Sequence, residues 1–329
     1  MEWERVPGPV RSCCETLWAA GEAACPVGGC VRDSLLGRTP GDWDVATSAR
    51  PETVQALFAR TVPTGLRHGT VTVLLDGMSL EVTAFRREEG YSDGRRPDRV
   101  VFGVGLTEDL ARRDFTINAM ALLPDGTVAD PFGGRADLVE RVIRCVGDPE
   151  RRFREDALRM LRAVRFAAQL GFAIEEETAA ALRREAAGLE QVSGERVRVE
   201  LEKTLLSQRP ELCALPVELG MLARFGAPAR QVDLTELAVL PATPEERWRG
   251  FCQKTGLDIP AMPVERRLRR AVLAEPSPVP ALTGGELYAM GFRGAAIRTA
   301  LDTLRSHISE YPEDNTKEKL REVLKKAGL

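Results

Sequence analysis

The sequence predicts an α+β fold in which a small mixed β-sheet head is followed by an all-helical neck, body and tail. Short apolar and β-branched runs, separated by glycine turns, fill the chain up to about residue 145 and are typical of strands. From Asp148 onward the apolar residues recur with helical spacing instead. The chain has 329 residues, of which 43% are hydrophobic, and this is enough for two or three cores. We therefore expect the head at residues 1–145, the neck at 146–212, and the body and tail at 213–329.

The head is expected to alternate helices and strands. We expect helices at residues 10–20, 31–36 and 48–60, and strands at residues 24–27, 42–45, 71–75 and 80–85. Asp76-Gly77, between the last two strands, is the strongest short signal for an antiparallel hairpin. The charged, glycine-rich stretch 86–105 has little periodicity to bury, so we expect a mobile surface loop there. Residues 110–122 are expected to pass from helix to strand, and residues 130–138 to form a hinge or tight connection.

A long helix is expected to open the neck. Asp148 can cap it, Pro149 suits its first turn, and Gly171 can close it. Residues 141–165 carry eight arginines against four acidic residues, although the net charge of the whole chain is −3. Further helices are expected at residues 176–189, 194–206, 211–224, 245–255, 264–273, 285–288, 295–308 and 316–326, with a proline-rich linker at 274–282.

The bulk composition disfavours several classes of protein. The first residues lack the basic and apolar regions of a signal peptide, and no apolar run approaches membrane-spanning length. We therefore expect a cytoplasmic protein with no membrane association. The seven cysteines include no CxxC pair, and the two histidines, His68 and His307, are far apart in the sequence. A zinc site or a Cys/His catalytic pair is not indicated.

A glycine turn stands at the start of the second expected helix. Gly28 and Gly29 follow the first expected strand, so backbone N–H groups would be bared where the helix begins. Phosphates bind readily at such a place. Arg32, three residues after Gly29, would bring a guanidinium that suits triphosphate oxygens, although most helix arginines are simply solvated.

Two aspartates follow a few residues later. Asp42 and Asp44 flank Trp43, and in an extended strand residues two apart point to the same face. Adjacent carboxylates repel one another unless a cation lies between them, and Mg²⁺ is the natural candidate. A DxD pair alone often occurs by chance, but the nearby glycine turn strengthens the interpretation of Asp42 and Asp44 as a metal site. Glu81 could complete a site for two metal ions on the same face, or it could equally face solvent.

Two charged clusters remain. In the first, Arg112, Arg113 and Asp114 border a run of apolar residues, and such charges either form a surface cluster or have a specific partner. In the second, Asp156 and Arg159 are three apart and therefore neighbours on one helix face, with Arg162 and Arg165 continuing the stripe. The simplest account of that stripe is an exposed ion pair worth a few tenths of a kcal/mol.

Six ordered motifs together resemble a known family. GGCVRD, GDWDVATS, HGTVTV, RRDFTINAMAL, DPFGGRADL and EDALRMLRAVRFAAQLGF are similar to motifs of the class II tRNA nucleotidyltransferases, the CCA-adding enzymes, and of their relatives the bacterial poly(A) polymerases. The resemblance covers about the first half of the chain continuously. The helical second half is compatible in length and class.

The resemblance implies roles for individual residues. Asp42 and Asp44 match the catalytic metal-binding carboxylates, and Gly29 and Arg32 match contacts to the nucleotide phosphates. Arg113 matches an arginine that contacts the nucleotide, with Asp114 and Asn118 near the ribose. The residues that match the motif in which side chains choose the incoming base are Asp156, Arg159, Arg162 and Arg165.

The choice of base also has a physical rationale. Cytosine and adenine each present an amino donor beside a ring-nitrogen acceptor, whereas uracil and guanine present the reverse order. A carboxylate acceptor beside an arginine donor therefore suits C and A. Pairing it with U or G would leave buried charged groups unsatisfied, at about 1–3 kcal/mol or more each.

The resemblance implies an activity and its partners. We expect Mg²⁺-dependent addition of C-C-A to the 3′ end of tRNA from CTP and ATP, with release of pyrophosphate and with contacts to the acceptor stem and elbow. Asp93-Gly94-Arg95, in a full-length loop, favours complete addition over addition of the two cytidines alone. The alternatives are a poly(A) polymerase or a partial-addition enzyme on the same scaffold, a small-molecule nucleotidyltransferase, and a catalytically silent RNA-binding protein. The sequence does not indicate an oligomeric state.

Overall fold

A computed structural model describes residues 3–91, 97–274 and 279–329. The chain divides into two compact units, residues 1–269 and residues 270–329, and each is described by itself. Asp93-Gly94-Arg95 lies outside the described residues. Among the helices that the structure describes, none is long and apolar enough to cross a bilayer.

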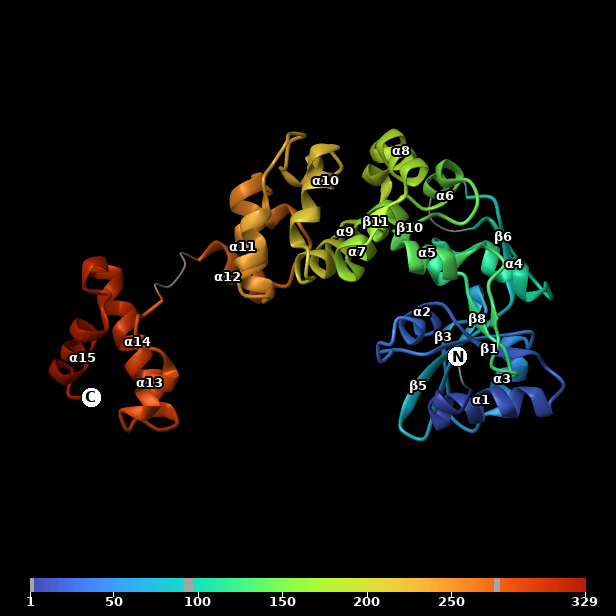
Figure 1. Cartoon of the computed structure of the whole chain (residues 1–329), viewed down its shortest axis with the longest axis horizontal. Coiled ribbons are helices and arrows are strands. Elements are labelled where there is room, and N and C mark those ends of the chain that lie inside the picture. Colours follow the sequence, from blue (N-terminus) through green and yellow to red (C-terminus); the bar gives the residue numbers. More distant parts are fainter. Residues whose placement is uncertain (1–2, 92–96, 275–278) are drawn as a thin grey trace. The chain divides into compact units, whose positions relative to one another are not determined.

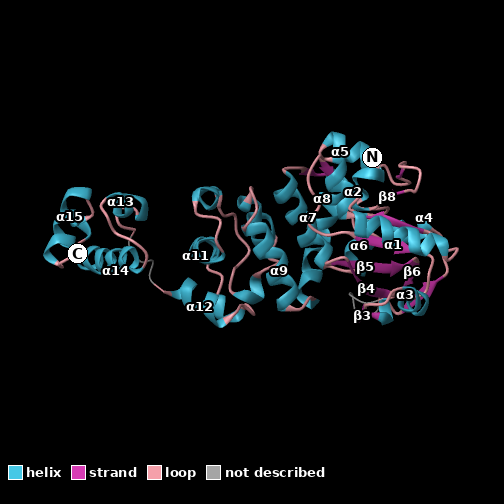
Figure 2. Ribbon diagram, turned by 90° about the horizontal axis from the view of Figure 1, so that it is seen from below, coloured by secondary structure: helices cyan, strands magenta, loops and turns pink. Residues whose placement is uncertain are grey.

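A seven-stranded mixed sheet lies in the N-terminal part of the first unit (Figure 2). Its spatial order is β3-β4-β5-β2-β1-β8-β9. The strands are β1 (Ala24–Val27), β2 (Asp44–Thr47), β3 (Thr61–Gly65), β4 (Thr70–Leu75), β5 (Met78–Ala84), β8 (Ala121–Leu122) and β9 (Val128–Ala129). Only the β2–β5 pairing within this sheet of described strands is parallel. The predicted α+β class and mixed sheet are therefore confirmed.

Three helices accompany the sheet: α1 (Gly8–Ala19), α2 (Gly29–Leu35) and α3 (Pro51–Leu57). α1 contacts β1, β2 and α3, whereas α2 contacts β1 and a 3₁₀ turn at Thr116–Asn118. The hairpin predicted around Asp76-Gly77 is confirmed, since β4 and β5 pair from Leu75 and Met78 outward. The predicted strand at 42–45 begins only at Asp44. β3 was missed because its three central residues are all exposed, so it has no alternating apolar pattern.

Two stretches predicted to be irregular are ordered. Within 86–105, β6 (Arg86–Glu89) and β7 (Arg99–Phe102) form an antiparallel hairpin followed closely by α4 (Leu106–Ala111), so the expected loop is wrong there. Charged side chains hold this hairpin, which apolar periodicity could not indicate. Within 130–138, α5 (Gly134–Glu140) replaces the expected connection, because the Asp130 carboxylate accepts hydrogen bonds from the N–H groups of Gly134 and Arg135.

The single helix expected at 148–171 is two helices. α6 (Pro149–Glu155) is capped by the Asp148 carboxylate, which accepts from the Glu150 N–H. The backbone then becomes extended at Asp156, with φ −150° and ψ 101°, before α7 (Leu158–Leu170) begins. Gly171 ends α7 in the left-handed region, as predicted. Most residues of α7 are buried. The segments before α6 and after α7 meet in a short parallel pair, β10 (Val142–Ile143) with β11 (Ala173–Ile174).

The remaining described segments are helical, as predicted (Figure 1). The first unit contains α8 (Glu176–Glu185), α9 (Gly194–Leu205), α10 (Ala214–Glu218) and α11 (Pro244–Thr255), and α12 (Arg266–Leu273) spans the division between units. The second unit contains α13 (Gly284–Ala289), α14 (Ala295–Glu310) and α15 (Lys317–Lys326). Leucines, together with Ala300 and Ile308, form its separate core. The helix expected at 211–224 is broken into a 3₁₀ turn, the short α10 and a second 3₁₀ turn.

Short 3₁₀ turns connect many of these elements. They lie at Trp3–Arg5, Leu66–His68, Thr116–Asn118, Ala186–Gln191, Pro210–Cys213, Ala223–Phe225, Thr235–Val239, Ile259–Ala261 and Pro312–Asp314.

Candidate active site

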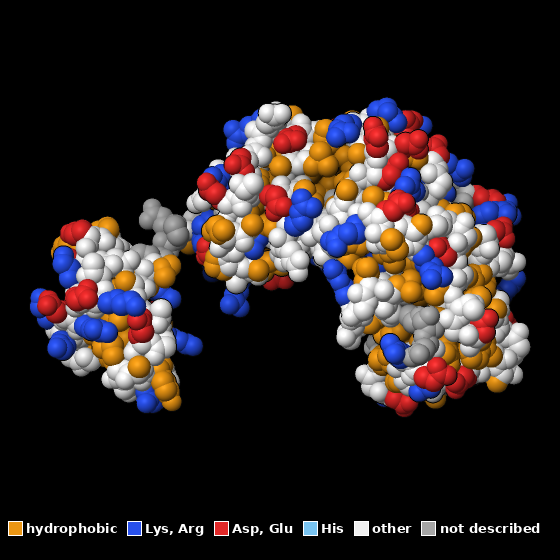
Figure 3. Space-filling model, viewed as in Figure 1, with side chains coloured by type: hydrophobic (Ala, Val, Ile, Leu, Met, Phe, Trp, Pro, Cys, Tyr) orange, Lys and Arg blue, Asp and Glu red, His pale blue; other side chains and the backbone are white. Residues whose placement is uncertain are grey.

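A polar cleft of about 970 Å³ lies in the first unit. It brings together every residue that the sequence analysis proposed for the site: Asp42, Asp44, Glu81, Gly28, Gly29, Arg32, Arg113, Asp114, Asn118, Asp156, Arg159, Arg162 and Arg165. Asp42, Asp44 and Glu81 come from β2, its preceding residues and β5, and helices α2, α7 and α9 supply most of the cations. On the face shown in Figure 3, Lys and Arg are interspersed with Asp and Glu over the first unit, so the concentration of arginines in this cleft is a local feature.

The glycine turn is sterically fixed. Gly28 has φ +80°, and a Cβ at this position would lie 2.8 Å from Nη1 of Arg113. Its N–H donates to the Met120 carbonyl, and its own carbonyl accepts from the Arg32 N–H at the start of α2. Only glycine suits both the conformation and the close approach of the arginine. The turn therefore leaves room for the guanidinium of Arg113, which pairs with Asp109 at 3.4 Å.

The three carboxylates lie on or just before two neighbouring strands. Asp44 opens β2, and in the parallel pairing of β2 with β5 its register partner is Glu81. Asp42 precedes the strand by two residues, and Trp43 between them is buried. Burial, together with the negative charges of Glu81 and Asp42, raises the pKa of Asp44, against the opposing effect of Arg113. Bringing these carboxylates together without a cation is therefore unfavourable, which is expected of a cation-binding site.

The carboxylates suit a hard divalent cation that shares its ligands with substrate. Oxygen donors of Asp and Glu are the ligands that Mg²⁺ prefers. Among the described residues, no three Asp, Glu, His or Cys side chains already form a closed ligand cluster. A cation held by Asp42 and Asp44 would thus take its remaining ligands from water and phosphate oxygens, as Mg²⁺ commonly does.

A chain of polar contacts links the glycine turn to α7. Nη1 of Arg32 donates to Oδ1 of Asn118 at 2.6 Å, and Nδ2 of Asn118 donates to Oδ1 of Asp114 at 3.1 Å. Asp114 in turn lies 2.6 Å from the guanidinium of Arg162. Asp114 and Asn118, which the resemblance places near the ribose, therefore also position two arginines of the cleft.

Three of these arginines lie around the ring of Phe166. The guanidinium carbons of Arg32, Arg162 and Arg165 lie 5.1, 5.4 and 4.3 Å from its centroid. Cations within about 6 Å of an aromatic face are attracted to it. The sequence analysis missed Phe166, although its position four residues after Arg162 on one helix could have suggested the contact.

The predicted ion pair between Asp156 and Arg159 is wrong. Because the helix breaks at Asp156, the two residues do not share a continuous helical face. Arg159 instead pairs with Glu155 at 2.8 Å. Asp156 pairs with Arg196 of α9 at 2.7 Å, a contact that spans 40 residues. No local pattern in the sequence could have shown that partner.

Further along α7, Arg165 pairs with Glu200 of α9 at 2.9 Å. Glu200 is buried, and the sequence analysis missed it as well. The cationic stripe of α7 is therefore not a solvated face. Its arginines are held by acidic partners from the head, from α6 and from α9.

The β6–β7 hairpin also lines the cleft. Glu88 ion-pairs with Arg86 at 2.8 Å and with Arg112 at 3.2 Å, and it accepts from the Tyr91 hydroxyl. Burial raises the pKa of Glu88, but Arg112 and Arg86 outweigh this and bring the pKa below its ordinary value. The Arg112 carbonyl accepts from Nη2 of Arg159 at 3.2 Å, so the hairpin contacts the α6–α7 region through Arg112.

Comparison with known proteins agrees with this architecture. The model of the poly A polymerase head domain matches residues 25–144, and that of a probable RNA and SrmB-binding site of polymerase A matches residues 171–225. The CCA-adding enzyme of Geobacillus stearothermophilus is 41% identical over 315 residues, covering 90% of this chain and 76% of that enzyme. The chain belongs to the CCA-adding enzyme family.

Two further comparisons give the extent of this family likeness. The CCA-adding enzyme of Lactiplantibacillus plantarum is 56% identical over 231 residues, covering 69% of this chain and 56% of that enzyme. The crystal structure of the Bacillus stearothermophilus CCA-adding enzyme in complex with CTP superposes with a TM-score of 0.68 at 30% identity, covering 98% of both chains. The chain spans 53–56% of the length of the first curated family members it matches.

Proposed function

We propose that this protein adds C-C-A to the 3′ end of tRNA, using CTP and ATP in a Mg²⁺-dependent nucleotidyl transfer. The 3′-hydroxyl of the tRNA loses its proton to water as its oxygen attacks the α-phosphorus, the bond from that phosphorus to the β-phosphate bridging oxygen breaks, and pyrophosphate leaves. The observation that carries the proposal is the single cleft that holds the carboxylates, the glycine turn and Asp156 with Arg159. The relative crystallised with CTP supports it.

In this proposal Asp42 and Asp44 hold Mg²⁺, with Glu81 as the third carboxylate of the catalytic group. The metal would lower the barrier by stabilising charge on the phosphates and the attacking oxygen. Gly28, Gly29, Arg32 and Arg113 bind the triphosphate. The raised pKa of Asp44 supports a cation at this place, because a positive ion relieves the repulsion that burial and Glu81 create.

Asp156 and Arg159 read the base. Oδ2 of Asp156 accepts one bond within the described residues, from Arg196, so it has a lone pair left for an amino group. Nη2 of Arg159 donates one of its two N–H groups to the Arg112 carbonyl and can offer the other to a ring nitrogen. One carboxylate and one guanidinium thus suit cytosine and adenine alike.

We assign catalysis to residues 1–145, base selection to 146–212 and tRNA binding to 213–329. Arg162 and Arg165, held by Asp114 and Glu200, would extend the cationic surface beside the nucleotide. The tRNA acceptor stem and elbow are the proposed RNA contacts, and the cytoplasm is the proposed location.

A decisive experiment uses a tRNA that ends before C-C-A. The protein is incubated with CTP alone, with ATP alone and with all four nucleotides, and the 3′ ends are sequenced. We expect two cytidines with CTP alone and C-C-A with the mixture. Failure to use CTP would favour a poly(A) polymerase or A-adding enzyme, and Asp42→Ala with undiminished incorporation would overturn the metal assignment.

A further inference from the structure

Helix α9 brings a side chain to Asp156 that the selection motif does not contain. Nη1 of Arg196 donates to Oδ1 of Asp156 at 3.2 Å, and Nη2 donates to Oδ2 at 2.7 Å. Both side chains line the cleft and are only 24% and 16% exposed. We propose that Arg196 is a positioning residue that determines nucleotide specificity by fixing the carboxylate of Asp156. This inference rests on the proposed function.

The two bonds fix both the position and the orientation of the Asp156 carboxylate. A guanidinium is planar and rigid, so two parallel N–H donors fix the plane of the carboxylate that they bind. A third bond, from the Leu158 N–H to Oδ1 at 3.1 Å, ties the same group to the start of α7. Because Oδ1 accepts two bonds and Oδ2 one, the acceptor that remains for a base lies on Oδ2.

A fixed acceptor discriminates between bases where a mobile one does not. An amino group of cytosine or adenine can donate to Oδ2, but the carbonyl of uracil or guanine at the same place meets a second acceptor. A carboxylate held only by Leu158 could turn away from that carbonyl and admit water as a bridge. Arg196 therefore acts mainly against the wrong nucleotides.

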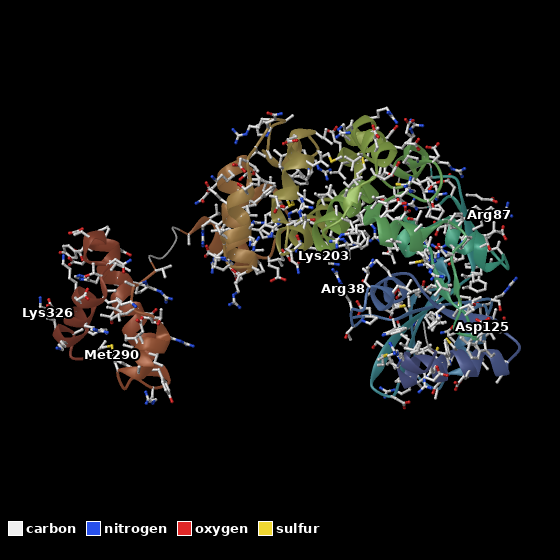
Figure 4. All side chains as sticks on the ribbon, in the orientation of Figure 1. Arg38, Arg87, Asp125, Lys203, Met290 and Lys326 are labelled. Atoms are coloured by element: carbon white, nitrogen blue, oxygen red, sulfur yellow. The ribbon has the colours of Figure 1, made fainter. Side chains whose placement is uncertain are left out.

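Arg196 is itself held in a rigid frame. α9 packs along α7, and one turn after Arg196 the buried Glu200 ion-pairs with Arg165. Lys203, labelled in Figure 4, lies a further turn along and also lines the cleft. Residues 196, 200 and 203 share one helical face at the spacing expected of a packed helix. The packing of α9 therefore fixes the direction from which the two-donor guanidinium of Arg196 approaches Asp156.

The test measures kcat/KM for CTP, ATP, UTP and GTP with a tRNA lacking C-C-A. We expect Arg196→Met to lower the ratio for CTP over UTP by roughly 10- to 100-fold, the effect typical of losing a charge-assisted hydrogen bond. Arg196→Lys keeps the charge but loses the fork, so its ratio is expected between those of Arg196→Met and the unchanged protein. In an Asp156→Asn background, Arg196→Met should have no further effect on the ratio.

Arg198→Met is the matched control. Arg198 lies two residues along α9, is also 24% exposed, and pairs with Glu202 at 3.3 Å. Arg198→Met should leave the ratio of kcat/KM for CTP over UTP unchanged. Thermal unfolding of both variants measures how much stability each loses with its ion pair. A purely structural role for Arg196 would slow all four nucleotides equally, and that outcome, or an equal change with Arg198→Met, overturns the inference. If the unchanged protein itself fails to use CTP and ATP, the proposed function falls instead.

Discussion

Asp114 and Arg162 join the sheet region to α7 through a contact of 2.6 Å, although 48 residues separate them in the chain. The carboxylate is buried and also accepts from Asn118 and from the Phe115 N–H. Burial alone would raise the pKa of Asp114, but Arg162 and Asn118 outweigh it and hold the pKa well below its ordinary range. The ionised carboxylate is therefore strongly favoured in the fold.

Asp114→Ala is expected to destabilise the first unit by about 1–3 kcal/mol, because it removes the buried carboxylate that accepts from Arg162, Asn118 and the Phe115 N–H. Urea unfolding followed by tryptophan fluorescence measures this, since all four tryptophans lie within residues 1–269. Glu211→Ala is the control, because Glu211 pairs with the 44% exposed Arg209. That change should cost less than about 1 kcal/mol. Equal losses for both variants would contradict a special role for Asp114.

The same pair predicts a pH dependence. In the unfolded chain an aspartate titrates near pH 3.9, whereas the folded pKa of Asp114 is depressed. Its stabilisation is therefore complete above about pH 4 and is lost as the pH falls toward the folded pKa. The stability difference between the unchanged protein and Asp114→Asn should be constant from pH 7 to pH 5 and shrink below pH 4. A difference that grows on acidification would show the opposite sign.

Local patterns predicted those parts of the site that local structure determines. The glycine turn and the Asp76-Gly77 hairpin depend on residues close in sequence, and the hairpin places Glu81 on the strand paired with Asp44. The partners of the α7 arginines could not be predicted, because Glu200 and Arg196 come from another helix. The break at Asp156 was also missed, because the helical spacing of apolar residues in α6 continues into α7 without interruption.

Glu88 offers a test of the hairpin that apolar periodicity did not indicate. Glu88→Gln removes the charge that pairs with Arg86 and Arg112, and a loss of about 1–3 kcal/mol in unfolding free energy is expected. The neighbouring Glu89 pairs with Arg87 but is 40% exposed, so Glu89→Gln should change stability by less than about 1 kcal/mol. If the two substitutions have the same effect, the buried network contributes nothing of its own.

Asp44→Asn is expected to stabilise the metal-free protein while abolishing nucleotide incorporation. Burial and Glu81 make the ionised Asp44 unfavourable, so removing its charge should raise the unfolding free energy in EDTA by about 0.5–2 kcal/mol, as is usual for changes at functional sites. Mg²⁺ should then stabilise the unchanged protein but not this variant. Asp76→Asn, at an exposed hairpin turn, should keep the full response to Mg²⁺. A variant that still gains stability from Mg²⁺ would place the cation elsewhere.

Phe166 tests whether the arginines of the cleft act together. Its ring lies within 5.4 Å of the guanidinium carbons of Arg32, Arg162 and Arg165. Phe166→Leu keeps an apolar side chain but removes the aromatic face, so KM for CTP and ATP should rise together by roughly three- to tenfold, with their preference over UTP unchanged. Phe172→Leu is the matched control, because Phe172 is equally buried and lies 5.3 Å from Arg141 outside the cleft. A change in nucleotide preference would mean that Phe166 acts on the base, whereas equal KM values for the two variants would mean that its ring does not position these three arginines.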